Sequence, residues 1–186
     1  DSPKRSPEKI LATCANLNAS VVAASHAPSQ SDLDTQSEYE LEQQLRFAIQ
    51  HGELELQFQP QIDAGTCTVA GAEALQRWNH PQLGLVSPHV AIPLLERSGL
   101  IEEVGLWIVN SACREARKWR DLGLPLSVAV NITSHQLTNL ELHPRLVRIL
   151  KSHGLSRDAL EVELTESAAA QDPERAARFF QAMRDS

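Results

Sequence analysis

Residues 54–81, LELQFQPQIDAGTCTVAGAEALQRWNHP, decide the fold because they hold two strand patterns separated by a short turn. Apolar and polar side chains alternate from Leu54 to Ile62, the period of two that is typical of a half-buried strand. Pro60 places the end of this strand at a sheet edge or a turn. A second strand is expected from Thr66 to about Trp78. The Gly-containing turn between them predicts an antiparallel hairpin.

Helices and strands alternate in the sequence around this hairpin. Helical patterns lie at residues 37–52, 87–99, 100–123, 134–137, 142–154 and 172–186, and further strand patterns lie at 125–132 and 159–167. Strand–helix–strand order predicts parallel strands joined by crossover helices. The expected class is therefore α/β, with one early antiparallel hairpin.

Oxygen-bearing side chains occur where three of the predicted strands run or end. Glu73 lies in the second strand, Asn131 in VAVNI and Glu163 in VELTES. Sites in α/β sheets form at the carboxyl ends of parallel strands, and oxygen-only ligand sets suit Mg²⁺ or Mn²⁺. Arg77 projects to the same strand face as Glu73 and could clamp a phosphate, and Gln59 could add a hydrogen bond.

Each of these residues also has a purely structural interpretation. Glu73 and Arg77 could form a buried ion pair, which is costly unless fully hydrogen-bonded. Asn131 could satisfy backbone groups at a strand end. Glu163 and Glu166 could be solvated, or could form a helix-entry cap. The joint position at strand ends, rather than any single residue, favours a site.

Composition narrows the class of protein. The chain has 186 residues, 42% hydrophobic and 22% charged, with a net charge of −7. This balance argues against nucleic-acid binding by a basic face, and no apolar run reaches the about 18 residues that span a bilayer. Cys14, Cys67 and Cys113 are widely spaced and odd in number, which is typical of reduced thiols. We therefore expect a cytoplasmic protein without a nucleic-acid partner or a membrane segment.

The first 37 residues differ in composition from the rest. They are rich in Ser, Ala, Asp and Gln, which indicates a linker or the end of an upstream signalling domain such as a receiver. Residues 38–186 are expected to form one domain. An upstream domain in the same chain is thus a predicted partner.

Four motifs, in this order and spacing, resemble one known family. FQPQI (58–62), GAEALQRWNHP (71–81), VAVNIT (128–133) and VELTES (162–167) look like the EAL-domain family, the bacterial phosphodiesterases of cyclic di-GMP. Glu73-Ala74-Leu75 is the signature itself. The resemblance covers the chain from about Leu41 onwards. It implies a modified TIM (β/α)8 barrel in which one early strand is antiparallel, in agreement with the hairpin.

The resemblance also implies an activity. In the family, two Mg²⁺ or Mn²⁺ ions activate a water that attacks one phosphodiester of cyclic di-GMP and releases linear pGpG. Carried over by motif, the metal ligands are Glu73, Asn131 and Glu163, and the substrate contacts are Gln59, Leu75 and Arg77. Glu166 corresponds to a residue that braces the loop beside the metals.

One part of the family pattern is missing from the 186 residues. After VELTES the family continues to an Asp-Asp pair followed by Phe-Gly-Thr-Gly, and then to a catalytic Lys, a Glu and a Gln. The chain holds about half to two-thirds of a barrel, which closes only with all its strands. We therefore expect a C-terminally truncated barrel that is inactive alone, with the catalytic Asp-Asp and Lys beyond Ser186.

Three functions remain open from the sequence. The first is a cyclic di-GMP phosphodiesterase module, which the retained Glu73 favours. The second is a catalytically inactive EAL domain that senses cyclic di-GMP or docks a protein. The third is a generic sugar-phosphate enzyme on a TIM barrel. EAL domains commonly dimerise through helices, so a homodimer is a further expectation.

Overall fold

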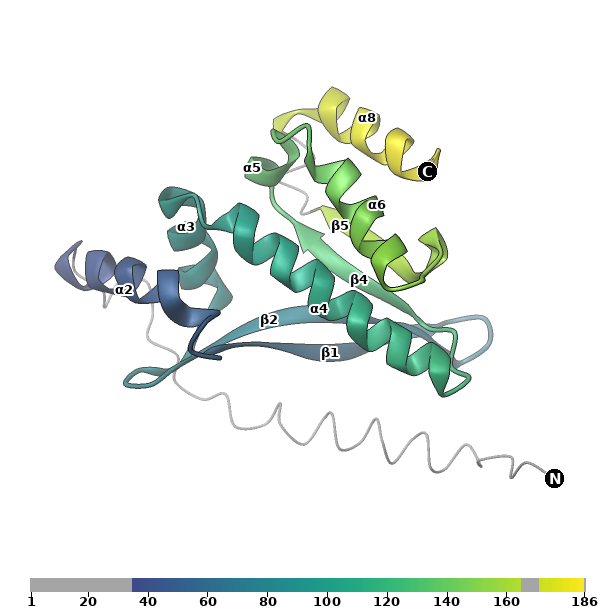
Figure 1. Ribbon diagram of the computed structural model, residues 1–186, viewed down its shortest axis with the longest axis horizontal. Helices are drawn as coiled ribbons and strands as arrows, with labels where there is room; N and C mark the ends of the chain where they lie inside the picture. The colour runs from purple at the N-terminus through teal and green to yellow at the C-terminus, as the bar shows by residue number, and fades with distance from the viewer. Residues whose placement is uncertain (1–34, 165–170, 186) are drawn as a thin grey trace.

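The computed structural model describes residues 35–164 and 171–185 of the chain. In chain order the elements are α2 (Thr35–Ala48), β1 (Leu54–Asp63), β2 (Thr68–His80), β3 (Gly84–Val86), α3 (Pro88–Ser98), α4 (Ile101–Asp121), β4 (Ser127–Ile132), α5 (Ser134–Leu137), α6 (Leu142–Ser152), the 3₁₀ helix η2 (Arg157–Ala159), β5 (Leu160–Leu164) and α8 (Pro173–Arg184). Five strands form one sheet in the order β1-β2-β4-β5, with β3 paired to β2 outside this path (Figure 1). The predicted α/β class is confirmed.

β1 and β2 form the predicted antiparallel hairpin, in which Gln59 lies opposite Glu73. The Asp63 carboxylate holds the turn by accepting hydrogen bonds from the backbone N–H and the hydroxyl of Thr66, at 2.7 and 2.9 Å. β2 runs on to His80, beyond its predicted end. The chain then turns back as β3, a short strand that the sequence did not predict.

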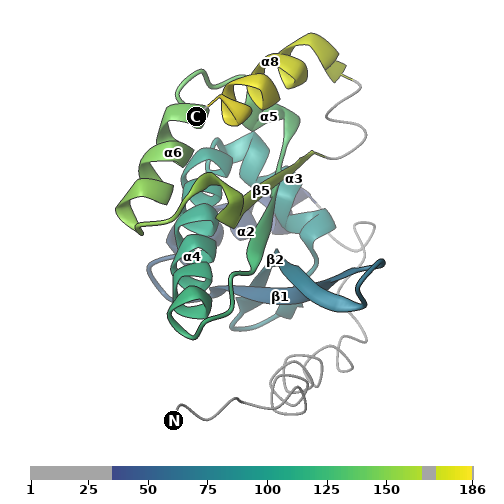
Figure 2. The same cartoon turned by 90° about the vertical axis from the view of Figure 1, so that its right-hand side faces the viewer.

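β4 lies parallel to β2, and β5 lies parallel to β4. Ala129 is opposite Glu73, and Glu163 is opposite Asn131. The crossovers run through α3 and α4 and then through α5 and α6, and Figure 2 shows α4 and α6 on the same side of β4 and β5. α3 and α8 begin as the sequence indicates, with Ser87 and Asp172 as N-caps and Pro in the first turn, and Gly99 ends α3 at a φ of 73°. α2 begins two residues before and ends four residues before its predicted bounds of 37–52.

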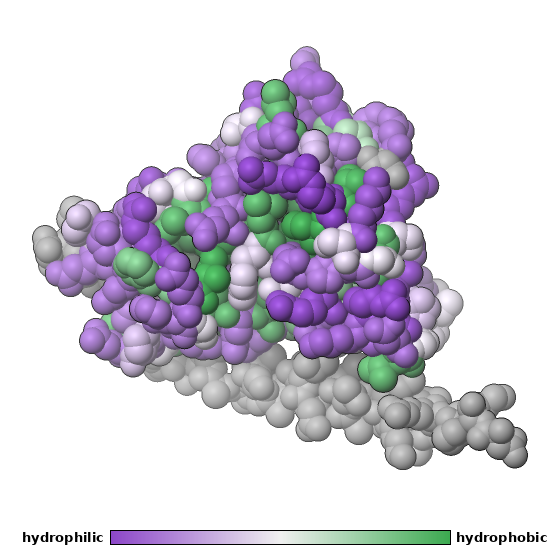
Figure 3. Space-filling view, in the orientation of Figure 1, coloured by the Kyte–Doolittle hydropathy of each residue, from purple (hydrophilic) through white to green (hydrophobic). Residues whose placement is uncertain are grey.

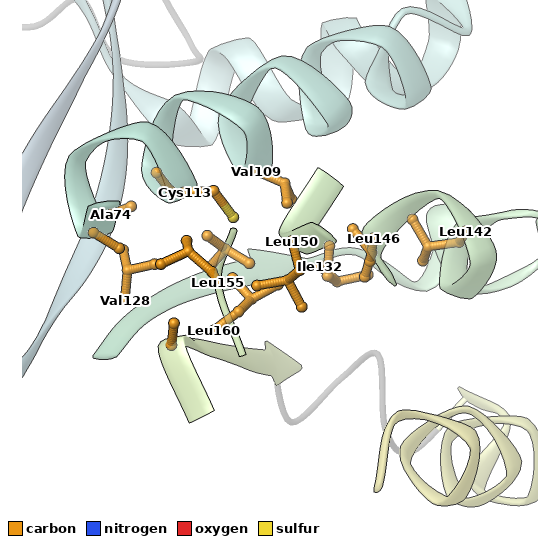
Figure 4. Packing of buried hydrophobic residues seen from close by; sticks show 14 of the residues in the cluster. Ala74, Val109, Cys113, Val128, Ile132, Leu142, Leu146, Leu150, Leu155 and Leu160 are labelled. Atoms are coloured by element: carbon orange, nitrogen blue, oxygen red, sulfur yellow. The ribbon is translucent and has the colours of Figure 1, made fainter. Parts of the chain in front are cut away.

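Apolar side chains pack between the sheet and these helices in two clusters. Figure 4 shows the larger one, which includes Cys113 of α4, Leu146 of α6, and Val128 and Ile132 of β4. The smaller cluster surrounds Trp78 between α2, α3 and β2. Even-numbered residues of β2 and β4 enter these clusters. Because strand side chains alternate, the odd-numbered residues face the side without helices.

The helix side carries mixed surface chemistry. Hydrophilic residues cover most of it, and hydrophobic residues show between the helices (Figure 3). No helix within residues 35–164 and 171–185 combines the length and apolarity needed to cross a bilayer. The predictions for the first 34 residues and for Glu166 lie outside the described part of the chain.

Candidate metal and phosphate site

The three residues predicted as metal ligands lie on neighbouring strands, on the sheet face opposite the helices. The side-chain amide of Asn131 donates from Nδ2 to Oε1 of Glu73 at 2.7 Å, between β4 and β2. Glu163 is the register partner of Asn131 on β5. Asn131 is exposed, whereas both carboxylates are half-buried. Parallel pairing of the strands is what brings residues 58 and 32 positions away from Asn131 to its side.

The structure adds a residue that the sequence did not single out. The side-chain amide of Gln61 on β1 donates from Nε2 to Oε1 of Glu163 on β5 at 3.2 Å. In the sequence, Gln61 is one of several polar residues on the same side of β1, 102 positions before Glu163. Its register partner on β2 is Gly71.

Arg77 lies on the same face as Glu73 but does not pair with it. Its Nε donates to Oε1 of Gln57 at 3.0 Å, and Nη1 donates to the backbone carbonyl of Gln76 at 3.0 Å. Within the described residues the buried Glu73–Arg77 ion pair is therefore not formed. Gln57 holds one edge of the guanidinium, so the group is oriented by a neutral neighbour and keeps its charge for a ligand.

The register of the hairpin positions the two remaining predicted substrate contacts, Gln59 and Leu75. Gln59 is exposed directly opposite Glu73, and Leu75 is half-buried between Glu73 and Arg77 along β2. All of these residues share one face of the hairpin because opposed residues of an antiparallel pair point to the same side. The prediction for Glu166 cannot be followed here because it lies outside the described residues.

The donor set fits a hard divalent cation by its chemistry. It consists of two carboxylates and one amide oxygen, and such cations take oxygen ligands and usually retain waters. The observed hydrogen bonds use Nδ2 of Asn131 and Oε1 of each carboxylate, so Oδ1 and both Oε2 atoms are not consumed by them. Among the described residues, no three His, Cys, Asp or Glu side chains gather as a metal cluster. The amide is therefore an essential member of this set.

Two hollows of the described surface lie away from these residues. One, of about 290 Å³, lies between α2 and the turn after β2 and is lined in part by Phe47, His51 and His80. A second, of about 170 Å³, lies between β1 and α4 beside Phe58 and Trp107. Neither hollow is lined by a predicted ligand.

A sheet with one antiparallel outer strand, followed by parallel strands that carry oxygen ligands, defines a TIM-like α/β barrel domain with a candidate metal site. Residues 42–186 match the family model of the EAL domain. The chain belongs to the EAL-domain family, which confirms both the resemblance and the fold class predicted from the sequence.

Two proteins with related sequences are cyclic di-GMP enzymes by name. The chain is 37% identical over 145 residues to the bifunctional diguanylate cyclase/cyclic di-GMP phosphodiesterase MucR of Pseudomonas aeruginosa, covering 77% of this chain and 21% of the relative. It is 36% identical over 141 residues to the cyclic di-GMP phosphodiesterase PdeR of Escherichia coli, covering 76% and 21%. The chain thus spans about a fifth of the length of these relatives.

Solved structures show the same likeness. The MucR phosphodiesterase in complex with cyclic di-GMP matches with a TM-score of 0.75 at 35% identity, over 78% of this chain and 60% of that one. The EAL enzyme Bd1971, in its form with cAMP and cyclic di-GMP bound, matches with a TM-score of 0.72 at 28% identity, over 96% and 47%. Both solved chains are longer than the matched region.

Proposed function

We propose that this chain is part of a cyclic di-GMP phosphodiesterase, which hydrolyses cyclic di-GMP to linear pGpG in bacterial second-messenger signalling. The observation that carries the proposal is the 2.7 Å contact between Asn131 and Glu73, with Glu163 beside Asn131 in register. It brings an oxygen-only ligand set to adjacent strands. The names of MucR and PdeR, and the cyclic di-GMP in the MucR complex, support the same substrate.

Glu73, Asn131 and Glu163 are the residues that would hold Mg²⁺ or Mn²⁺. A bound divalent ion supplies the activation of a water and the neutralisation of charge on the phosphoryl oxygens. The amide of Asn131 holds one oxygen of Glu73, which fixes how that carboxylate is presented. Both acidic ligands come from strands of a hydrogen-bonded sheet, so their spacing is set before any ligand binds.

Arg77, Gln59 and Leu75 would contact the cyclic dinucleotide. The guanidinium of Arg77 is oriented by Gln57 and lies on the same strand face as Glu73. It would bind a phosphate by charge-assisted hydrogen bonds, while Leu75 packs beside the ligand. Local cations of this kind let a chain of net charge −7 bind a dianion, because the field near a site differs from the global one.

We extend the proposal to the context of the domain. Residues 38–186 belong to a cytoplasmic EAL domain, residues 1–37 connect it to an upstream signalling domain, and Glu166 braces the loop beside the metals. The domain forms a homodimer. The Asp-Asp pair and the Phe-Gly-Thr-Gly run of the family do not occur among these 186 residues. We therefore expect this chain alone to bind cyclic di-GMP without hydrolysing it.

Calorimetric titration of the purified chain with cyclic di-GMP, in Mn²⁺ or in excess chelator, tests the proposal, with pGpG followed by chromatography. We expect binding that weakens at least about tenfold in chelator and in Glu73→Gln, since a carboxylate ligand is lost. Binding that is indifferent to both changes would favour the inactive sensor. Absence of binding under every condition would overturn the proposal.

A further inference from the structure

The hydrogen bond between Gln61 and Glu163 joins two strands that are not neighbours in the sheet. β2 and β4 lie between β1 and β5 in the sheet order. In a flat sheet, three strand spacings would separate β1 from β5 by roughly 14 Å. Nε2 of Gln61 nevertheless lies 3.2 Å from Oε1 of Glu163. The two side chains therefore meet across the curled, helix-free face of the sheet.

A register shift of the β1–β2 hairpin lies beside this contact. The register of the hairpin is interrupted between Gln61 and Ile62. The shift leaves Ala70 of β2 without a partner on β1, and an extra residue of this kind increases the local twist of the strand pair and is typical of positions beside active sites. The irregularity thus lies next to Gln61, whose side chain contacts Glu163 of β5.

Gly71 lies opposite Gln61, at a close approach of β2 to β4. It is the register partner of Gln61 on β2. A Cβ atom there would lie 2.4 Å from Oγ of Ser127, 2.8 Å from the carbonyl oxygen of Ser127 and 3.4 Å from Oε1 of Gln61. Any side chain at position 71 would therefore collide with Ser127 of β4, whereas it would make an ordinary contact with the amide of Gln61. The absence of a side chain is a steric requirement of the pairing of β2 with β4, the two strands that lie between Gln61 and Glu163.

We propose that Gln61 is a positioning residue for Glu163, an inference that rests on the proposed metal-binding function. Its neutral amide donates to one oxygen of the carboxylate and leaves Oε2 for a cation, as Asn131 does for Glu73. Being uncharged, it orients the ligand without repelling the cation or competing for it as an anion. Partners of metal ligands act in this way: they fix the orientation of the ligand and raise metal affinity.

Titration of the 186-residue chain with Mn²⁺, with the free ion measured by electron paramagnetic resonance, tests the inference. Gln61→Leu removes the donor at similar size, and Gln61→Asn keeps an amide that is too short to reach. We expect each to raise the Kd for Mn²⁺ by about tenfold, the lower end of the range for such partners. Gln82→Leu, the same chemical change at an exposed position in the turn after β2, should leave the Kd unchanged.

The outcomes separate this inference from the proposed function. Circular dichroism and the thermal midpoint without metal identify variants with altered folding. If Gln61→Leu does not fold, the Kd of Gln61→Asn for Mn²⁺ is the test of the inference. If Glu163→Gln weakens Mn²⁺ binding but both Gln61 variants match the unaltered chain, the positioning role is wrong and the metal site stands. If Glu163→Gln has no effect on Mn²⁺ binding, the proposed metal site and this inference both fall.

Discussion

His80 and Gln44 join β2 to α2 through a 2.6 Å contact between Nε2 of the imidazole and Oε1 of the amide. Nδ1 of His80 accepts hydrogen bonds from the backbone N–H groups of Gln82 and Leu83, at 3.2 and 3.1 Å. The proton of the neutral ring is therefore on Nε2, which donates to Gln44. His80 is only 4% exposed, so the ring is buried between these elements. The ring stabilises the turn after β2 and the packing of α2.

Replacing His80 by Phe should lower the free energy of unfolding by about 2 kcal/mol, because two backbone N–H groups and the Gln44 amide lose their buried partner. Urea denaturation with a shared m-value measures the change. His89→Phe, at an exposed position on α3, is the matched control and should be nearly neutral. Equal effects of the two substitutions would show that the hydrogen bonds of His80 do not stabilise the fold.

Trp78 should be the most sensitive single core position around α2 and α3. Its side chain is 0% exposed, and Nε1 donates to Oε2 of Glu53 at 3.1 Å. Trp78→Ala should cost about 3–5 kcal/mol by loss of buried area and formation of a cavity. Trp78→Phe keeps most of the volume but not the donor, and should cost less. Thermal unfolding of the two variants checks the order, and a larger loss for Phe would contradict it.

Arg77→Lys should weaken cyclic di-GMP binding about tenfold, the value of one charge-assisted hydrogen bond. Lysine keeps the charge but cannot present two parallel N–H groups to a phosphate or donate from a fixed Nε to Gln57. Arg114→Lys on α4, outside the proposed site, is the control. Calorimetry in Mn²⁺ measures both. A matched loss in the two variants would mean that bulk charge, not the geometry of Arg77, governs binding.

The main helices and strands could be predicted because each is specified by a local sequence pattern. Alternation in β1, the β-branched run of β4 and the caps at Ser87 and Asp172 each specify an element without help from distant residues. Parallel pairing then places the middle of β2 beside β4, and β4 beside β5, so the closeness of Glu73 to Asn131 follows from topology.

What could not be predicted depends on how the sheet curls and how loops fold back. The contact of Gln61 with Glu163 spans two intervening strands and lies beside a register shift of the hairpin, neither of which follows from the local pattern of β1. The three residues of β3 are too few to show a period of two. The burial of His80 follows from packing of α2 over the hairpin, which no local pattern of that residue indicates.

The two described cysteines should differ in reactivity. Cys113 is fully buried between α4 and the sheet, and burial raises its pKa to about 11, whereas Cys67 is exposed in the hairpin turn. In a chain with Cys14 and Cys67 replaced by Ser, Ellman's reagent at pH 8 should therefore react with Cys113 only after unfolding.

The raised pKa of Cys113 also predicts a pH dependence of stability. Because the pKa of this thiol is higher in the folded than in the unfolded chain, its contribution to the free energy of unfolding is fully present below about pH 8.5 and is lost as the pH rises toward 11. Cys113→Ala should remove that part of the alkaline slope in urea denaturation between pH 8 and 11, and an unchanged slope would show that the buried thiol is not its source.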